Sequence, residues 1–323
     1  MKPLDIDFDP YAHDPGHWGP ALVNFAELLV GCLDAAGARS VVEIGAYAGD
    51  LTGFLVKWGA RSGARIGAID PDPEPDLVKL ADANPALDLV RETSLDALGR
   101  IELPDAVIID GDHNYYTVSE ELRLIGERAQ GSALPLLLFH DVCWPHARRD
   151  DYYAPDQVPE EHRQPIVEGG GVFPGEPGIR PGGLPFRFAA AREGGPRNGV
   201  LTAIEDFVAS SDGLRLVIVP AFFGLGVVFH RDAPYAERIA AILDPFDRHP
   251  MLERLEANRV LHLASVHYQM VEVGRLQERL GRQEALLHKL LESKTFALGV
   301  ALSRLRQRGE PAYSKDEVRR ALG

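Results

Sequence analysis

The hydrophobic and polar positions of the first two thirds of the chain follow two periods that alternate along the sequence. Apolar residues at helical spacing run through residues 19–40, with Gly37 as the expected helix C-cap. Short apolar runs lie within the segments 40–59, 64–76, 87–98, 105–116 and 132–142, and a helical pattern covers 117–130. Short apolar strands that alternate with helices predict an α/β fold with a Rossmann-like, doubly wound and mostly parallel sheet.

The periodicity fails from Trp144 to Asn198, where Gly and Pro are frequent. An irregular segment of this length is usually functional or disordered, so residues 144–198 are predicted to be a lid or substrate insertion. Regular patterns resume with a helix at 198–211 and two strands within 214–230 around a Phe-Gly turn. These strands predict an antiparallel hairpin that closes the sheet, so the sheet domain spans residues 41–230.

Both ends of the chain are predicted to be helical, in an N-terminal segment 1–40 and a C-terminal segment 231–323. The latter has a heptad-like seam, broken at Gln277 and Glu284, that consists of Val266, Met270, Val273, Leu280, Leu287, Leu291 and Leu298. Between residues 275 and 308 it carries eight Lys or Arg against three Glu. The pattern favours a homodimer formed through a coiled coil. Packing back on the sheet and peripheral membrane contact through residues 294–308 are the alternatives.

Composition narrows the class of protein. An apolar fraction of 45% and a charged fraction of 25% in 323 residues are typical of a soluble globular protein. A net charge of −14 argues against nonspecific nucleic-acid binding. The two cysteines suggest a reducing cytoplasm, and the acidic N-terminus lacks the features of a secretion signal. We therefore expect a cytoplasmic protein that acts on a small or uncharged molecule.

Glycines and acids follow the ends of the first two predicted strands. Glu43, Gly45 and Gly49 form an E-x-G-x-x-x-G pattern at the first strand–helix turn. Glycine there lets the backbone approach a ligand, and the helix N-terminus offers free N–H groups. Asp70 ends the second strand about 20 residues further on, where an acid can accept hydrogen bonds from ribose hydroxyls, and Asp72 competes for this role.

The third strand ends in Ser94 and Asp96, which either face an adenine or cap the next helix. In this order the features resemble the class I S-adenosylmethionine (SAM)-dependent methyltransferases, over residues 41–230 and including the hairpin. Tyr47 stands where that pattern often has a middle glycine. The resemblance implies SAM as the cofactor and a binding site that consists of Glu43, Gly45, Ala46, Tyr47, Gly49, Asp70, Ser94, Leu95 and Asp110.

Two further acids follow the fourth and fifth predicted strands. Asp110 ends the fourth strand and Asp141 ends the fifth, and the tips of adjacent parallel strands are neighbours. Two carboxylates there can hold a divalent cation and leave positions open for substrate hydroxyls. His113, three residues past Asp110, is placed to take a proton from such a hydroxyl.

The motif IDGDH followed by HDV is similar to the metal-dependent O-methyltransferases that modify sugars of natural products, the macrocin O-methyltransferase-like enzymes, and to the related methyltransferase domain family 24. The resemblance implies Mg²⁺ at Asp110 and Asp141, with His113 as the base. His140 stands where those relatives carry an acid. His140 has three interpretations: a nitrogen ligand that favours Mn²⁺, Fe²⁺ or Zn²⁺, a second base, or a sign that the metal site is lost. Asp112 is another residue that could supply the missing carboxylate.

The residues directly after Asp141 are expected to cover the site. Their aromatic rings and arginines suit a sugar or a substrate that carries phosphate or carboxylate. A lid held by surface ion pairs is the alternative. The predicted substrate contacts, which include the return of the insertion, are Trp144, Arg148, Arg149, Tyr152, Tyr153, Arg197 and Asn198.

The sequence thus predicts a SAM-dependent O-methyltransferase that modifies a hydroxyl of a sugar or glycosylated small molecule, in natural-product or polysaccharide biosynthesis. A divalent metal, Mg²⁺ by resemblance or Mn²⁺, and a histidine base would assist it. One alternative is a metal-independent small-molecule methyltransferase with His113 or His140 as base. Another is an assembly or regulatory protein that keeps a cofactor fold and works through its C-terminal helices.

Overall fold

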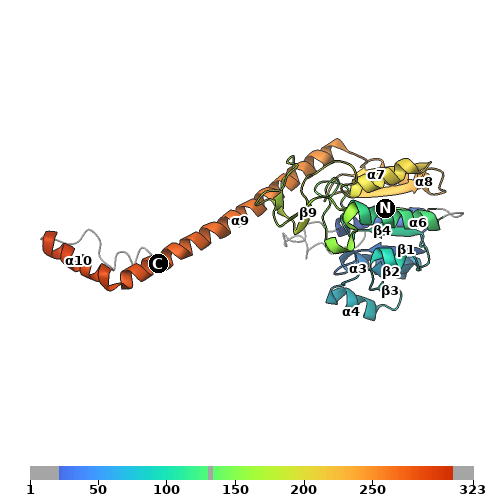
Figure 1. Ribbon diagram of the computed structural model, residues 1–323. Coiled ribbons are helices and arrows are strands. Elements are labelled where there is room, and N and C mark those ends of the chain that lie inside the picture. Colours follow the sequence, from blue (N-terminus) through green and yellow to red (C-terminus); the bar gives the residue numbers. More distant parts are fainter. Residues whose placement is uncertain (1–21, 130–133, 308–323) are drawn as a thin grey trace. The chain divides into compact units, whose positions relative to one another are not determined.

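A computed structural model describes residues 22–129 and 134–307 of the chain (Figure 1). The remainder of the predicted N-terminal and C-terminal helical segments lies outside the described residues. The chain divides into two compact units, Met1–Ser265 and Val266–Gly323. The first unit holds the sheet and every residue predicted for the site.

Seven strands form one sheet in the order β10-β11-β5-β4-β1-β2-β3. Their bounds are β1 Ser40–Ile44, β2 Arg65–Ile69, β3 Leu87–Val90, β4 Ala106–Ile109, β5 Leu136–Phe139, β10 Leu214–Val219 and β11 Leu225–His230. Strands β1 to β5 are parallel, and β11 runs antiparallel to both β5 and β10. The predicted fold class, a mostly parallel Rossmann-like sheet with a C-terminal antiparallel hairpin, is confirmed.

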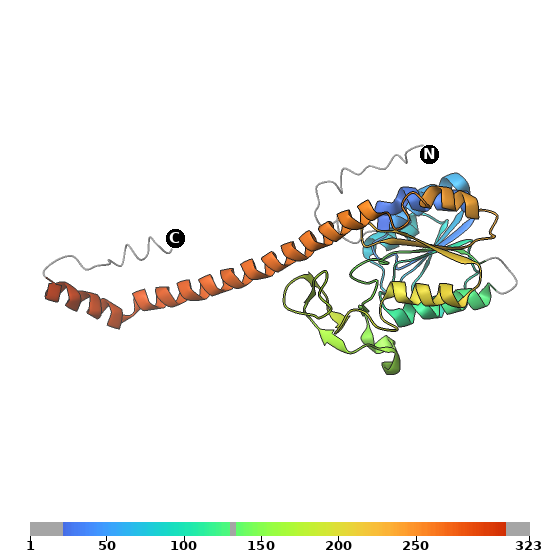
Figure 2. The same ribbon diagram turned by 90° about the horizontal axis from the view of Figure 1, so that it is seen from above.

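Helices cover both faces of the sheet (Figure 2), because its central strands are apolar on both sides. β4 and β5 are buried at every residue. One face packs against α2 Ala26–Ala36, α3 Asp50–Ser62, α4 Pro75–Ala83 and α8 Ala236–Leu243. The other packs against α5 Ser94–Leu98, α6 Tyr115–Arg128 and α7 Val200–Ser210. The short helix η1 Leu22–Phe25 precedes α2, which ends at Gly37 with a φ of 69°, as predicted.

The strand order reverses beside β1, since the chain adds β2 and β3 on one side and β4 and β5 on the other. Ligands of open α/β sheets bind outside the carboxyl ends of the strands at such a point. Gly45 follows β1 with a φ of 83°, and a Cβ atom there would lie 2.2 Å from the carbonyl oxygen of Asp110. The tips of β1 and β4 are therefore in backbone contact, which only glycine permits.

The β10–β11 hairpin brings another turn to the same edge. Because β11 is antiparallel to both neighbours, β10 runs in the direction of β5 and its carboxyl end meets theirs. Phe222 and Phe223 in this turn have positive φ values of 46° and 66°. Their N–H groups donate to the carboxylate of Glu256 at 3.0 and 2.8 Å. Glu256 lies on α9 Pro250–Glu292, near its start.

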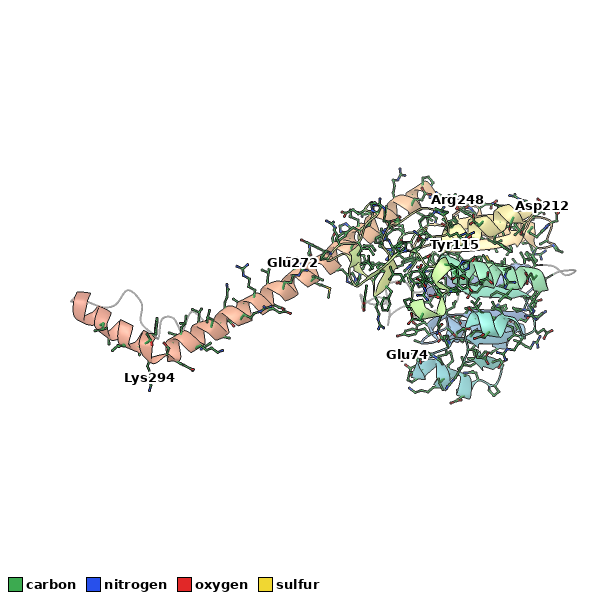
Figure 3. The ribbon with its side chains drawn as sticks, in the orientation of Figure 1. Glu74, Tyr115, Asp212, Arg248, Glu272 and Lys294 are labelled. Carbon is green, nitrogen blue, oxygen red and sulfur yellow. The ribbon has the colours of Figure 1, made fainter. Side chains whose placement is uncertain are left out.

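Residues 144–198 form an insertion of very short elements. η2 Pro155–Gln157 and η3 Glu160–His162 precede two strand pairs, β6 Ile166–Glu168 with β9 Phe188–Ala190 and β7 Gly171–Val172 with β8 Leu184–Pro185. Strands of two or three residues are too short to show a period in the sequence. Asp150 ties the insertion to the sheet domain, since its Oδ1 accepts the N–H groups of Tyr115 (Figure 3) and Gly199, both at 2.7 Å.

The second unit contains the end of α9 and α10 Lys294–Gln307. Four residues of the predicted seam, Val266, Met270, Val273 and Leu280, are 51%, 64%, 51% and 56% exposed. None of the helices in the described ranges is long and apolar enough to span a membrane.

Candidate active site

The turn after β1 holds a buried carboxyl group. Glu43 is 3% exposed and accepts a hydrogen bond from the Thr52 hydroxyl at 2.6 Å. Burial raises the pKa of Glu43 to about 8, against the opposing effect of the Thr52 hydrogen bond. At neutral pH this carboxyl therefore keeps a proton that it can donate.

Asp70, at the tip of β2, lies against the same turn. Its Oδ2 accepts the N–H of Tyr47 at 2.7 Å, and its Oδ1 accepts the N–H of Asp72 at 2.9 Å. Asp72 itself is exposed, so the carboxylate that faces the turn is that of Asp70. Each of its oxygens keeps a second lone pair for a ribose hydroxyl. The Tyr47 side chain is 62% exposed, and Ala46 beside it is buried.

The turn after β3 differs from the prediction in its helix cap. Thr93 caps α5, because its hydroxyl accepts the N–H of Asp96 at 3.3 Å. Ser94 is the first residue of α5 and is buried, and Leu95 is half-buried. Neither residue caps the helix.

Four side chains converge where β4 and β5 end. Nε2 of His113 lies 2.8 Å from Oδ2 of Asp141 and 3.8 Å from Oδ1 of Asp110. Nδ1 of His140 lies 3.1 Å from Oδ1 of Asp110 and 3.3 Å from Oδ2 of Asp141. Asp141 is fully buried and has a φ of 60°. A positive φ in a residue other than glycine is costly and is concentrated at functional sites.

His113 and Asp141 face each other without a hydrogen bond. Both ring nitrogens of His113 and both carboxylate oxygens of Asp141 are buried and lack a hydrogen-bond partner among the described residues. The 2.8 Å contact is therefore close but not aligned. Unpaired buried polar atoms are costly in a protein interior, so this arrangement fits a group that binds a ligand or cation.

The hydrogen bonds of His140 decide which of its nitrogens is available. Nε2 lies 2.9 Å from the carbonyl oxygen of Phe222, which can only accept, so Nε2 carries a proton. In a neutral ring the lone pair of Nδ1 then faces two carboxylates, which is favourable only with a cation between them. Two ligand atoms that each lie about 2.1 Å from a metal are about 3.0 Å apart when their bonds to the metal meet at a right angle. The distances of 3.1 and 3.3 Å at Nδ1 match this, so the donor set fits a divalent cation.

Without a cation, protons on the histidines would balance the charge of the carboxylates. Burial lowers the pKa of His140, but Asp141 and Asp110 outweigh it and hold that pKa well above its usual value. Burial likewise lowers the pKa of His113, but Tyr153 and Asp141 leave it well above the usual value. Burial raises the pKa of Asp141, but the two histidines bring it well below its usual value. The cluster thus holds either imidazolium groups or a cation.

Two residues that sequence reasoning missed lie against His113. The ring centroids of His146 and His113 are 4.3 Å apart, and burial together with the charge of His113 lowers the pKa of His146 to about 3. The N–H of Asp151 donates to the carbonyl oxygen of His113 at 3.0 Å, and burial raises the pKa of Asp151 to about 6. Tyr153, a predicted substrate residue, is 65% exposed with its ring centroid 5.5 Å from that of His113.

Three predicted substrate residues are buried within the insertion. Arg149 donates to two carbonyl oxygens at 2.6 and 2.8 Å. Tyr152 donates to Asp150 at 2.8 Å, and Asn198 donates to two carbonyl oxygens at 2.9 Å. Buried polar groups need hydrogen-bond partners, and here the insertion supplies them.

The remaining predicted substrate residues lie in different surroundings. Arg148 lies 2.7 Å from Glu205 on α7, as in the alternative of a lid held by ion pairs. Arg197 is exposed, and Trp144 packs in a small apolar cluster within the insertion. Among the predicted substrate residues, Tyr153 is the one whose ring lies beside His113.

The reversal of strand order, the turn after β1 and the acids at the strand tips define a class I methyltransferase domain. Residues 42–142 match the model of a family described as a methyltransferase domain. The fold and this match identify a SAM-dependent methyltransferase domain within the chain.

Some solved structures are similar to this chain at low identity. A methyltransferase from Podospora anserina with bound S-adenosylhomocysteine is 14% identical (TM-score 0.41, 69% of this chain and 84% of that chain). A putative caffeoyl-CoA O-methyltransferase from Staphylococcus aureus is 10% identical (0.42, 69% and 90%). A methyltransferase from Geobacter sulfurreducens is 13% identical (0.38, 69% and 86%). A comparison with curated proteins gave no match.

Proposed function

We propose that this methyltransferase transfers the SAM methyl group to a hydroxyl of a sugar or glycosylated small molecule, with the help of a divalent cation. The observation that carries the proposal is the convergence of carboxylate and imidazole atoms from Asp110, His140 and Asp141 beside His113. Such a group lies outside the carboxyl ends of the strands, where an acceptor would meet the cofactor.

Asp110, Asp141 and Nδ1 of His140 would hold the cation. When bound, it would orient the acceptor oxygens and lower the pKa of the reacting hydroxyl. A nitrogen donor among the three favours Mn²⁺, Fe²⁺ or Zn²⁺ relative to a site made of oxygens alone. Because Nε2 of His140 is engaged by Phe222, this residue is a ligand in the proposal and not a second base.

His113 is then the base. Its Nε2 faces the cluster at 2.8 Å from Asp141, whose negative charge stabilises the imidazolium that forms. The hydroxyl proton passes to Nε2, the hydroxyl oxygen forms a bond to the methyl carbon, and the carbon–sulfur bond breaks to leave S-adenosylhomocysteine. Most of the acceleration would come from holding the two reactants in line.

The class of acceptor rests on the resemblance of the IDGDH and HDV segments to sugar O-methyltransferases. The exposed ring of Tyr153 beside His113 supports it, since small-molecule sites combine aromatic walls with a few placed polar groups. The buried charged cluster argues against a purely assembling role, because an unused cluster of this kind would only cost stability.

Calorimetric titration tests the cofactor and the cation together. S-adenosylhomocysteine is titrated into metal-stripped protein alone, with Mg²⁺ and with Mn²⁺, and the metals are titrated into the wild type, Asp141→Ala and the control Asp72→Asn. We expect cofactor binding throughout and metal binding that is lost in Asp141→Ala only. Cofactor binding without any metal response would favour the metal-independent methyltransferase, and no cofactor binding would contradict the proposal as a whole.

An assay of methyl transfer identifies the acceptor. Protein with isotope-labelled SAM is incubated with panels of free sugars, nucleotide sugars and glycosides, with and without EDTA. We expect a labelled methyl ether on a sugar hydroxyl, at least about a hundredfold slower in His113→Gln and abolished by EDTA. Label found only on nitrogen or carbon atoms would exclude O-methylation.

A further inference from the structure

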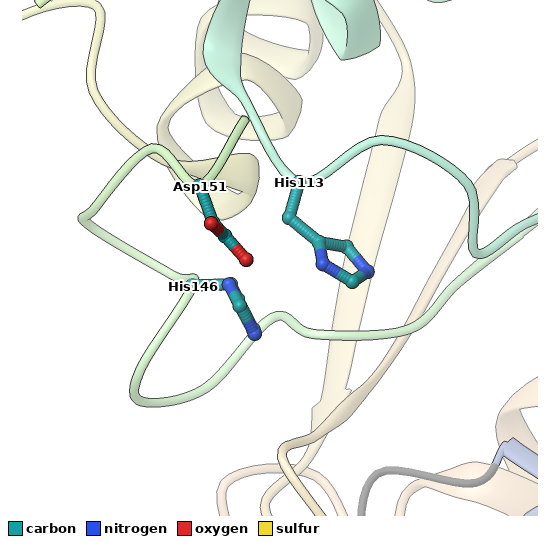
Figure 4. A group of neighbouring side chains, drawn as sticks. All are labelled: His113, His146 and Asp151. Carbon is teal, nitrogen blue, oxygen red and sulfur yellow. The ribbon is translucent and has the colours of Figure 1, made fainter. Parts of the chain in front are cut away.

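A second group of possible metal ligands lies on the other side of His113. One ligand atom each from His113, His146 and Asp151 lie within 4.8 Å of one another. Figure 4 shows the carboxylate of Asp151 next to the His146 ring and on the same side of His113, whose ring nitrogen next to Cγ, Nδ1, lies on this side. The other nitrogen, Nε2, is the one near Asp141. The two nitrogens of one ring thus serve two different groups.

The two imidazoles of this group are buried, whereas Asp151 is half-buried. His113 and His146 are each 9% exposed. Nδ1 of both rings is buried without a hydrogen-bond partner in the described part of the chain. Two imidazoles and one carboxylate that leave these atoms unpaired form the type of donor set that binds Zn²⁺, Fe²⁺ or Co²⁺ in preference to Mg²⁺.

The backbone holds the three residues in place independently of any ion. The N–H of Asp151 donates to the carbonyl oxygen of His113 at 3.0 Å, and the carbonyl oxygen of His146 accepts the N–H of Val200 at 2.9 Å. The His146 ring lies between those of His113 and Phe186, with centroid distances of 4.3 and 5.4 Å. Ligand atoms of a bound metal lie about 3.0–3.4 Å apart, so the three ligand atoms would have to approach one another to bind it.

We propose that His113, His146 and Asp151 form a second cation site, which binds a transition metal such as Zn²⁺ and thereby switches off the base. An imidazole that coordinates through Nδ1 keeps its proton on Nε2 and has no lone pair left there. A metal at the second site therefore prevents Nε2 of His113 from accepting the hydroxyl proton. Only this inhibitory consequence rests on the proposed function, since metal binding itself needs no reaction.

Cobalt titration of the full-length, metal-stripped protein tests the site, with binding followed by the visible absorption of Co²⁺ and by calorimetry. The wild type is compared with His146→Gln, Asp151→Asn and Asp110→Asn. We expect two equivalents of Co²⁺ in the wild type. His146→Gln and Asp151→Asn should each weaken one of them by about tenfold or more. Asp110→Asn should weaken only the other.

The outcomes separate this proposal from the proposed function. If His146→Gln, checked for folding by circular dichroism, binds Co²⁺ as the wild type does, the second site is wrong. A single equivalent that is lost in Asp110→Asn also contradicts it, and leaves the first metal site intact. If Asp110→Asn has no effect while His146→Gln loses binding, the second site stands and the metal-assisted mechanism fails. With Zn²⁺ in place of Co²⁺, the Nδ1 resonance of His113 should move to the position of a metal-bound nitrogen in the wild type and not in His146→Gln.

Discussion

Nδ1 of His140 lies 3.1 Å from Oδ1 of Asp110 because the two residues follow paired positions of adjacent strands. Ile109 of β4 is in register with Phe139 of β5, and the N–H of His140 donates to the carbonyl oxygen of Ile109 at 3.1 Å. The sheet itself therefore sets the distance between two groups of the cluster. A third group, the carbonyl oxygen of Phe222, fixes the proton on Nε2 of the same ring.

Replacement of His140 should therefore change metal preference more than cofactor binding. His140→Glu restores the acid expected from the resemblance, and should raise the affinity for Mg²⁺ relative to Mn²⁺ because all donors become oxygen. His140→Ala should weaken both metals by about tenfold or more. Calorimetry measures both affinities, with S-adenosylhomocysteine binding as the control. Equal metal affinities in the wild type and His140→Ala would show that His140 is not a ligand.

The contact between Gly45 and the backbone of Asp110 predicts a strongly destabilised variant. In Gly45→Ala the new Cβ would lie 2.2 Å from a carbonyl oxygen, at a φ of 83° that alanine rarely adopts. We expect a loss of more than about 2 kcal/mol in unfolding free energy, together with weaker S-adenosylhomocysteine binding. Gly63→Ala, which has a φ of 74° and open space around it, is the matched control for backbone conformation alone. A Gly45→Ala variant no less stable than Gly63→Ala would refute the close contact.

The strands and their tips were predictable because the physics that sets them is local. Short apolar runs between turns predicted β1 to β5, and the rule that parallel strands share a carboxyl edge placed Asp110, His113, His140 and Asp141 together. The position of β11 between β5 and β10 was not predictable from pattern, since a hairpin can add to a sheet edge by either strand.

The placement of side chains in the insertion, residues 144–198, could not be predicted from the sequence. Arg149 and Tyr152 look like ligand-binding side chains, but hydrogen bonds to distant backbone groups bury them. His146 and Asp151 lie in the same stretch and approach His113. Without a period of 2 or 3.6 residues, nothing in the sequence indicates which side chains of this stretch face inward.

Glu256 is predicted to act on the cluster through the hairpin turn. It accepts the N–H groups of Phe222 and Phe223 and pairs with Arg259 at 2.7 Å. Glu256→Ala removes both bonds from a turn with two positive φ values, and should cost about 1.5–3 kcal/mol of unfolding free energy. Because the carbonyl of Phe222 fixes His140, metal affinity should fall as well. Glu253→Ala, an exposed neighbour on α9, should change neither in denaturant unfolding and calorimetry.

We propose that the exposed part of the α9 seam, which excludes the buried Leu291, pairs two copies of the chain. Val266, Met270, Val273 and Leu280 repeat at heptad spacing and are all more than half exposed. Leu280→Glu should convert a dimer to a monomer in light scattering, because it places a charge in the seam. Arg282→Glu introduces the same residue outside the seam and should leave the mass unchanged. A wild-type chain that is monomeric at micromolar concentration would dismiss the pairing.

The buried carboxyl of Glu121 on α6 predicts how stability depends on pH. Burial raises its pKa to about 8 from the usual 4.5, more than the nearby Ser94 lowers it. Between these values the unfolded chain loses the proton while the folded protein keeps it. Folding stability from this group is therefore complete below pH 4.5 and declines as the pH rises to about 8.

Glu121→Gln removes this titration. It should leave stability nearly unchanged at pH 5 and raise it at pH 8 by on the order of 1–3 kcal/mol, because an ionised carboxylate is no longer held in an apolar interior. Urea unfolding at both pH values measures the difference. Glu74→Gln, which removes an exposed carboxylate, should show no such dependence. Equal effects of Glu121→Gln at pH 5 and pH 8 would mean that Glu121 ionises normally in the folded protein.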